Sequence, residues 1–193
     1  MHRALFLAAT VVGLVAAGTT RGQCPSPTLQ ANFDAVRYMG TWFEQARDST
    51  MPWESNDCQQ ARYSLNADGT VAVYNTQYNP ATDIVEGANA TATFDGAHGK
   101  VKFFWYAPAG DYQVLASDYE NYAIVYSCSD FYLAKTEYIW VLTRAMHPDQ
   151  QIIVDALNTL KAKVPGYDQT YIRRTLHGDE NNCKYFGDNL LIQ

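Results

Sequence analysis

Cysteines are the side chains of this chain with the widest range of possible chemistry, because a thiol can act as a nucleophile, a metal ligand or half of a disulfide. There are four of them, at Cys24, Cys58, Cys128 and Cys183. No Cys-x-x-Cys spacing occurs and the histidines are scattered, so the pattern does not favour a zinc site. An even number of cysteines is typical of paired disulfides in a secreted protein, and sequence alone allows three pairings.

The histidines and serines do not form a pattern typical of a metal, haem or catalytic site. His98 and His147 lie beside turn residues and His177 lies in a polar segment, so we expect all three to be exposed to solvent. A haem ligand would need a histidine on an inward strand face, and the pattern places none there. No serine nucleophile motif is present. We therefore expect no catalytic residue, no metal site and no cofactor.

A tryptophan and an arginine about a hundred residues apart could form one defined contact. Trp42 lies in the segment YMGTWFE at residues 38–44, and Arg144 ends the segment YIWVLTR at residues 138–144. A guanidinium group over an indole ring stabilises a structure by about 0.5–2 kcal/mol, depending on how dry the contact is. Such a pair would close one end of a β-barrel.

The N-terminal segment has the features of a secretory signal peptide. Arg3 gives it positive charge, residues 4–17 are apolar or small, and the run is too short to span a bilayer. Cleavage after Gly22 would leave residues 23–193, which suffice for one domain. The leader contains Arg3, Arg21 and no acidic residue, so 12 of the 14 basic residues remain against 20 acidic ones, a net charge near −8. Such a surface disfavours nucleic-acid partners.

The elements that would position these side chains are mostly strands. Segments rich in Tyr, Val, Thr and Phe are separated by turn residues about ten positions apart, which predicts an all-β fold. The expected strands lie near residues 41–49, 58–66, 70–78, 84–94, 100–107, 111–117, 121–128, 136–145 and 169–175. A single helix is expected from about Pro148 to Val164, because Ile152, Ile153, Ala156, Leu157 and Leu160 recur at three- and four-residue steps. Its one apolar stripe predicts that it covers the outside of the sheet.

Three blocks of sequence together resemble the signatures of the lipocalin family. They are residues 32–34 with 38–44, residues 117–122 (SDYENY), and residues 138–144, in this order. The resemblance covers residues 24–183 and implies an eight-stranded antiparallel up-and-down β-barrel with one C-terminal helix packed outside. It also implies two disulfides, Cys24 with Cys128 and Cys58 with Cys183. Asp118 and Tyr119 would then shape a strand-to-strand turn.

Alternation along the strands predicts which side chains face the barrel interior, since residues two apart share a face. With Trp42 inward, Glu44 and Ala46 should face inward too, and we expect Glu44 to be a hydrogen-bonded structural carboxylate. Alternation places Trp105 and Leu142 inward, and the resemblance favours Tyr63, Asn75, Phe103 and Trp140 as pocket positions. Each of these side chains could equally be core packing. The ligand-binding candidates are Tyr63, Asn75, Phe103, Trp105, Trp140 and Leu142.

These patterns predict a secreted, extracellular carrier that binds one small hydrophobic ligand, such as a fatty acid, sterol, retinoid or bilin, in the barrel cavity. The alternative is a lipocalin-type isomerase acting on a lipid, which would need a free cysteine inside the cavity. A third hypothesis is contact with a receptor or membrane through mouth loops such as Met51-Pro52-Trp53. The sequon at Asn89 is a candidate glycosylation site.

Overall fold

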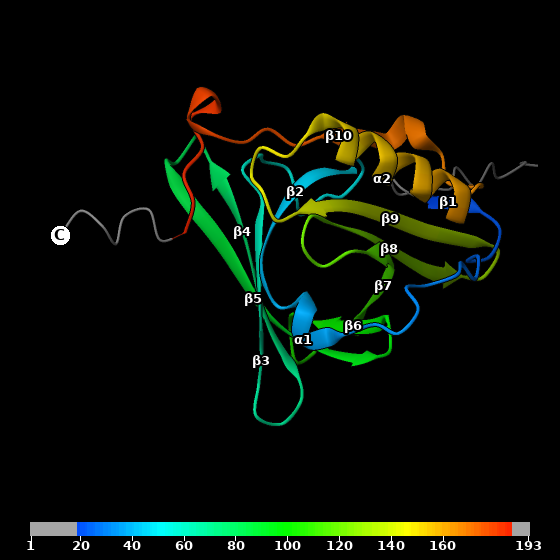
Figure 1. The fold of residues 1–193 in the computed structure, drawn as a ribbon. Helices are drawn as coiled ribbons and strands as arrows, with labels where there is room; N and C mark the ends of the chain where they lie inside the picture. Colours follow the sequence, from blue (N-terminus) through cyan, green and yellow to red (C-terminus); the bar gives the residue numbers. More distant parts are fainter. Residues whose placement is uncertain (1–18, 187–193) are drawn as a thin grey trace, which may run out of the picture.

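Alternating apolar segments and turns form strands that pair in sequence order into one antiparallel sheet (Figure 1). The structure is a computed structural model that describes residues 19–186. The strands are β1 Thr19–Arg21, β2 Gly40–Asp48, β3 Gln60–Leu65, β4 Val71–Asn79, β5 Ile84–Asp95, β6 His98–Lys102, β7 Gly110–Ser117, β8 Tyr122–Phe131, β9 Ala134–Thr143 and β10 Ile172–Arg174. The helices are α1 Ala35–Tyr38 and α2 Gln150–Lys163, with single 3-10 turns η1 Gln169–Tyr171 and η2 Asp179–Asn181.

Pairing of β2 with both β3 and β9 closes the sheet, so β2 to β9 form an eight-stranded barrel. Closure satisfies the edge hydrogen bonds that an open sheet would expose. The two remaining strands extend the sheet, with β1 beside β9 and β10 beside β2. The expected up-and-down barrel is therefore confirmed, and the ninth expected strand, at residues 169–175, is shortened to β10.

A β-bulge in β2 changes which of its side chains face inward. Glu44 lies opposite Leu142, whereas Ala46 lies opposite Val141, so the register shifts between them. A one-residue slip reverses the faces of all later residues. The expectation that Ala46 faces the interior is wrong for this reason, because Ala46 is buried outside the barrel in the cluster that also contains Ile153 of α2. Arg47 instead lies opposite Trp140.

The fifth barrel strand, β6, ends earlier than the sequence predicts. β7 begins at Gly110, which lies opposite Val101 of β6. Residues of β6 after Val101 therefore have no partner on β7. Residues 103–109 form a loop in place of the expected strand at 100–107. The expectation that Phe103 and Trp105 share an inward strand face is therefore wrong, and Trp105 is 87% exposed.

Helix α2 covers the outer face of β7, β8 and β9, as its apolar stripe predicts (Figure 1). Asp149 caps its N-terminus by accepting a hydrogen bond from the Gln151 amide, a stabilising arrangement. Ile153, Ala156 and Leu160 are buried in one cluster with side chains of the strands beneath. The helix thus forms a second core outside the barrel and leaves the interior free.

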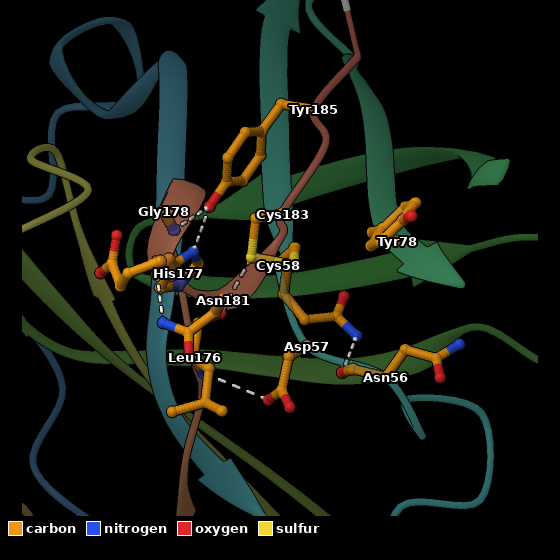
Figure 2. Close-up of a disulfide and its surroundings, with 12 residues drawn as sticks. Asn56, Asp57, Cys58, Tyr78, Leu176, His177, Gly178, Asn181, Cys183 and Tyr185 are labelled. Atoms are coloured by element: carbon orange, nitrogen blue, oxygen red, sulfur yellow. Dashed lines mark hydrogen bonds between the residues drawn. A yellow bond between two sulfur atoms is a disulfide. The ribbon is translucent and has the colours of Figure 1, made fainter. Parts of the chain in front are cut away.

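The two disulfides fasten the chain ends to the barrel. Cys24 is bonded to Cys128 of β8, and Cys58, just before β3, is bonded to Cys183 (Figure 2). Both implied pairings are confirmed, and all four cysteines are used. The second bridge lies in the C-terminal segment, which is also hydrogen-bonded to Gln45 of β2 and Arg62 of β3.

His177 in that C-terminal segment is buried, so the expectation that it is exposed to solvent is wrong. Its Nδ1 lies 2.9 Å from the Tyr185 hydroxyl and its Nε2 lies 2.5 Å from the Glu44 carbonyl oxygen (Figure 2 shows the Tyr185 contact). Burial lowers the pKa of His177 below its usual value. The neutral imidazole therefore joins the segment to β2 by hydrogen bonding.

The expected leader, residues 1–22, lies mostly outside the described residues. Its last part, β1, pairs with Thr136 to Ala134 of β9. Within residues 19–186, no helix combines the length and the hydropathy needed to cross a bilayer.

Candidate ligand-binding cavity

The base of the barrel is sealed by the arginine and tryptophan that the sequence singles out. The Arg144 guanidinium carbon lies 3.7 Å from the centre of the Trp42 ring. The guanidinium also donates hydrogen bonds to the carbonyl oxygens of Thr41, Tyr119 and Arg37 at 2.9–3.0 Å. Burial lowers the pKa of Arg144, although arginine remains charged at any physiological pH. The expected closing contact is confirmed.

Gly40 is required beside this contact for two reasons. Its φ of +100° lies in a region that side chains other than glycine rarely adopt. A Cβ there would also lie 3.1 Å from Nη1 of Arg144. The spacing of glycine and tryptophan in the sequence therefore has a direct steric cause.

The turn before β8 holds Arg144 from the other side. Tyr119 adopts a φ of +70°, and its hydroxyl accepts a hydrogen bond from the Asp34 amide. The Asp118 carboxylate accepts hydrogen bonds from the amides of the three residues that follow Tyr119, at 2.8–3.1 Å. These contacts support the architectural role expected for Asp118 and Tyr119.

Above the base lies a layer of three tyrosines. The Tyr112 hydroxyl lies 2.9 Å from that of Tyr38 and 3.2 Å from that of Tyr63. Burial raises the pKa of all three, that of Tyr63 to about 12. The phenols are therefore neutral, and they form a polar point in an otherwise aromatic floor that includes Phe94.

A cavity of about 690 Å³ occupies the barrel above this floor. This volume lies within the roughly 300–1,000 Å³ typical of small-molecule sites. Five of the six candidate residues line it, namely Tyr63, Asn75, Phe103, Trp140 and Leu142. Trp105 does not line it, because the loop at residues 103–109 directs that side chain into solvent. Other apolar lining side chains include Ala61, Val71, Val73, Ala92, Phe94 and Val101.

The loop between β2 and β3 supplies a lining residue that strand periodicity does not reveal. Glu54 lies in this loop, and its Oε2 accepts a 2.9 Å hydrogen bond from Nε1 of Trp140. The Trp53 ring packs edge-on against that of Tyr138, with centroids 5.0 Å apart. The loop therefore folds back over the cavity. In the sequence, Trp53 is the one sign that this loop contacts something apolar.

Arg47 holds the loop in this position. Its Nη2 donates hydrogen bonds to the carbonyl oxygens of Glu54 and Asn56, and its Nη1 lies 2.7 Å from Oε1 of Glu44. Glu44 accepts a further 2.5 Å hydrogen bond from the Thr175 hydroxyl. Glu44 is thus the hydrogen-bonded structural carboxylate expected from sequence.

Glu54 has no cation of its own. Burial and the neighbouring Glu44 raise its pKa to about 8, so the carboxyl group is largely protonated at neutral pH. Glu54 is one of the residues that line the cavity. The protonated group can donate one hydrogen bond and accept others.

Neither a metal site nor a free thiol is found in the described part of the chain. Within residues 19–186, no group of three or more His, Cys, Asp or Glu side chains is arranged to hold a metal ion. Every cysteine is in a disulfide, so the cavity contains no thiol nucleophile of the kind that the isomerase hypothesis requires.

Comparisons with known proteins agree with this architecture. The family model described as a lipocalin-like domain matches residues 33–177. Apolipoprotein D of Macaca fascicularis is 34% identical over 94% of this chain and 97% of its own length. Among solved structures, lobster apocrustacyanin A1 superposes with a TM-score of 0.73 at 20% identity, covering 85% of this chain and 93% of its own. Insecticyanin of the tobacco hornworm Manduca sexta gives 0.72 at 23% identity, covering 87% and 93%.

Proposed function

The chain belongs to the lipocalin family, and on this premise we propose that it is a secreted carrier that binds one small hydrophobic ligand in its barrel. The observation that carries the proposal is the cavity of about 690 Å³, sealed at the Trp42 end and lined mainly by apolar side chains. A closed barrel with a dry compartment can shelter an oily molecule from water. Its extracellular location agrees with the expected leader and with the two disulfides.

The affinity expected from this cavity permits both capture and release. Burying roughly 400 Å² of apolar ligand surface at about 25 cal/mol per Å² gives on the order of 10 kcal/mol before costs. Loss of ligand freedom leaves about 6–9 kcal/mol, a dissociation constant near micromolar or somewhat tighter. A carrier needs such an intermediate affinity.

We propose Tyr63, Asn75, Phe103, Trp140 and Leu142 as ligand contacts. Trp140 offers the test, because a bound ligand would lie against its indole and change its emission. Titration of the purified protein with retinol, a fatty acid or a bilin should change the tryptophan fluorescence, and Trp140→Phe should remove most of that change. Trp105→Phe is the matched control, since Trp105 lies outside the cavity. Absence of any change with all three ligand types would contradict the carrier proposal.

We also propose that the mouth of the barrel contacts a lipid surface when the ligand is exchanged. The loops joining β2 to β3, β6 to β7 and β8 to β9 lie at the same end of the meander. These loops and the last residue of β8 carry seven exposed apolar or aromatic side chains: Trp53, Phe104, Trp105, Tyr106, Phe131, Tyr132 and Leu133. So many exposed apolar side chains at one end are typical of an interaction surface.

Liposome flotation tests this mouth contact. Vesicles should be zwitterionic, because the acidic protein is repelled by anionic lipid. Tyr132→Ser with Leu133→Ser should reduce the floated fraction, whereas Val36→Ser, an exposed apolar position on α1, should not. Equal flotation of both variants would contradict the contact.

Asn89 is the proposed glycosylation site. It is exposed on β5 opposite Tyr74, where an attached glycan would extend into solvent. Secreted protein from a eukaryotic host should lose mass on treatment with an N-glycosidase, and Asn89→Gln should abolish that loss.

A further inference from the structure

Carboxyl groups line the interior of the barrel without any basic side chain beside them on the cavity wall. Glu44, Glu54 and Glu86 line the cavity, and no lysine, arginine or histidine is among its lining residues. We propose that the cavity selects an uncharged ligand that carries a hydroxyl group over the carboxylate of the same carbon skeleton. This inference rests on the proposed carrier function and names the ligand class.

The nearest cation is unavailable to a ligand. Arg47 uses Nη1 for Glu44 and for the Thr175 hydroxyl, and Nη2 for two carbonyl oxygens of the loop above, and only its buried Nε has no hydrogen-bond partner. It is buried behind these groups and does not line the cavity. A ligand carboxylate that reached this level would meet Glu44 and Glu54 with no free positive charge to compensate.

The two basic side chains beside Asp111 are also occupied. Asp111 also borders the cavity, but its carboxylate lies 2.6 Å from His98 Nε2 and 2.8 Å from Lys100 Nζ, so both basic groups are already paired. Glu86 accepts hydrogen bonds from the amides of Gln77 and Asn79, at 3.1 Å and 2.6 Å. Like charges close together in a low-dielectric cavity repel, and an unpaired ionised group is costly to bury.

A ligand hydroxyl group, in contrast, would find a hydrogen-bond acceptor in the cavity wall. Asn75 lines the cavity, and its side-chain oxygen is buried without a hydrogen-bond partner. A buried acceptor without a donor is unfavourable, so a ligand O–H group that reached it would gain a hydrogen bond. A carboxylate has no proton to donate to this oxygen.

Matched ligand pairs test the inference with the whole secreted protein. Retinol with retinoate, and 1-hexadecanol with palmitate, differ at the polar end only. At pH 8.5 we expect each alcohol to bind at least tenfold more tightly than its acid, measured by tryptophan quenching or by displacement of a fluorescent probe. Asn75→Ala should lower the affinity for retinol relative to anhydroretinol, which lacks the hydroxyl group. Glu54→Gln combined with Glu86→Gln should lower the preference for alcohol over acid.

The outcomes separate the inference from the function on which it rests. Equal or tighter binding of the acids by the unaltered protein overturns the inference and leaves the carrier function standing. An unchanged preference in both variants, with thermal unfolding showing that they fold, also overturns it. Absence of binding by all four ligands overturns both the inference and the carrier function.

Discussion

Replacing Arg144 with methionine should destabilise the protein far more than a surface arginine substitution does. The change keeps an unbranched side chain but removes the contact with Trp42 and the hydrogen bonds to the carbonyl oxygens of Thr41, Tyr119 and Arg37. Because these bonds join α1, β2 and the turn before β8, their loss opens the base of the barrel.

The magnitude follows from these contacts. The cation–π contact contributes about 0.5–2 kcal/mol, and each hydrogen bond from a charged donor about 1.5–3 kcal/mol. Arg144 is only half-buried, so water can replace part of these bonds and the sum is an upper bound. We expect a loss of roughly 2–4 kcal/mol in the free energy of unfolding, a large fraction of the usual 5–15 kcal/mol.

The assay is urea unfolding followed by tryptophan emission, with the disulfides intact. Arg144→Lys keeps the charge but cannot reach all three carbonyl oxygens, so it should fall between the wild type and Arg144→Met. Arg37→Met is the control, because it removes a cation–π contact with Tyr119 and a largely exposed pair with Glu120, of a kind that contributes about 0–1 kcal/mol, but none of the hydrogen bonds from Arg144. Arg144→Met within 1 kcal/mol of that control would refute the reasoning.

Three further predictions follow from the same geometry. Folding raises the pKa of Glu54 from 4.5 to about 8, so the folded state holds a proton that the unfolded state releases, and stability should fall as pH rises from 4.5 to 8. The melting temperature of Glu54→Gln should fall less steeply with pH than that of the unaltered protein, and equal slopes of melting temperature against pH would contradict the raised pKa. Gly40→Ala should cost about 1–3 kcal/mol through backbone strain, whereas Gly166→Ala, in open space, should stay within about 0.5 kcal/mol by urea unfolding. Replacing both Cys58 and Cys183 by serine should cost about 2–5 kcal/mol because it frees a 125-residue loop, and an unchanged unfolding midpoint would refute that.

Features encoded by local pattern could be predicted from the sequence. The stripe that defines α2 and the turn residues between strands depend on neighbours in the chain. The need for glycine at position 40 depends also on Arg144, which is distant in the chain. The seal by Arg144 required the family resemblance in addition, because nothing local joins it to Trp42. The cysteine pairing came from that resemblance as well, since counting alone leaves three possibilities open.

The remaining features depend on contacts that periodicity cannot express. The inward turn of Arg47 needs the bulge in β2, and the exposure of Trp105 follows from the point at which β7 stops pairing with β6. His177 is buried only because its segment returns across β2. Glu54 lies in a loop, where residue spacing carries no information about facing.

The bulge in β2 connects fold and binding. By turning Arg47 inward, it neutralises Glu44 and anchors the loop that brings Glu54 over the cavity. The same arginine is already paired with Glu44, so Glu54 lies in a buried position beside a carboxylate neighbour without an ion pair of its own, which is why its pKa rises. The barrel therefore gains a closed loop and a protonated acid from one displaced residue, and the resulting wall offers hydrogen bonds to a ligand but no basic side chain to pair with a negative charge.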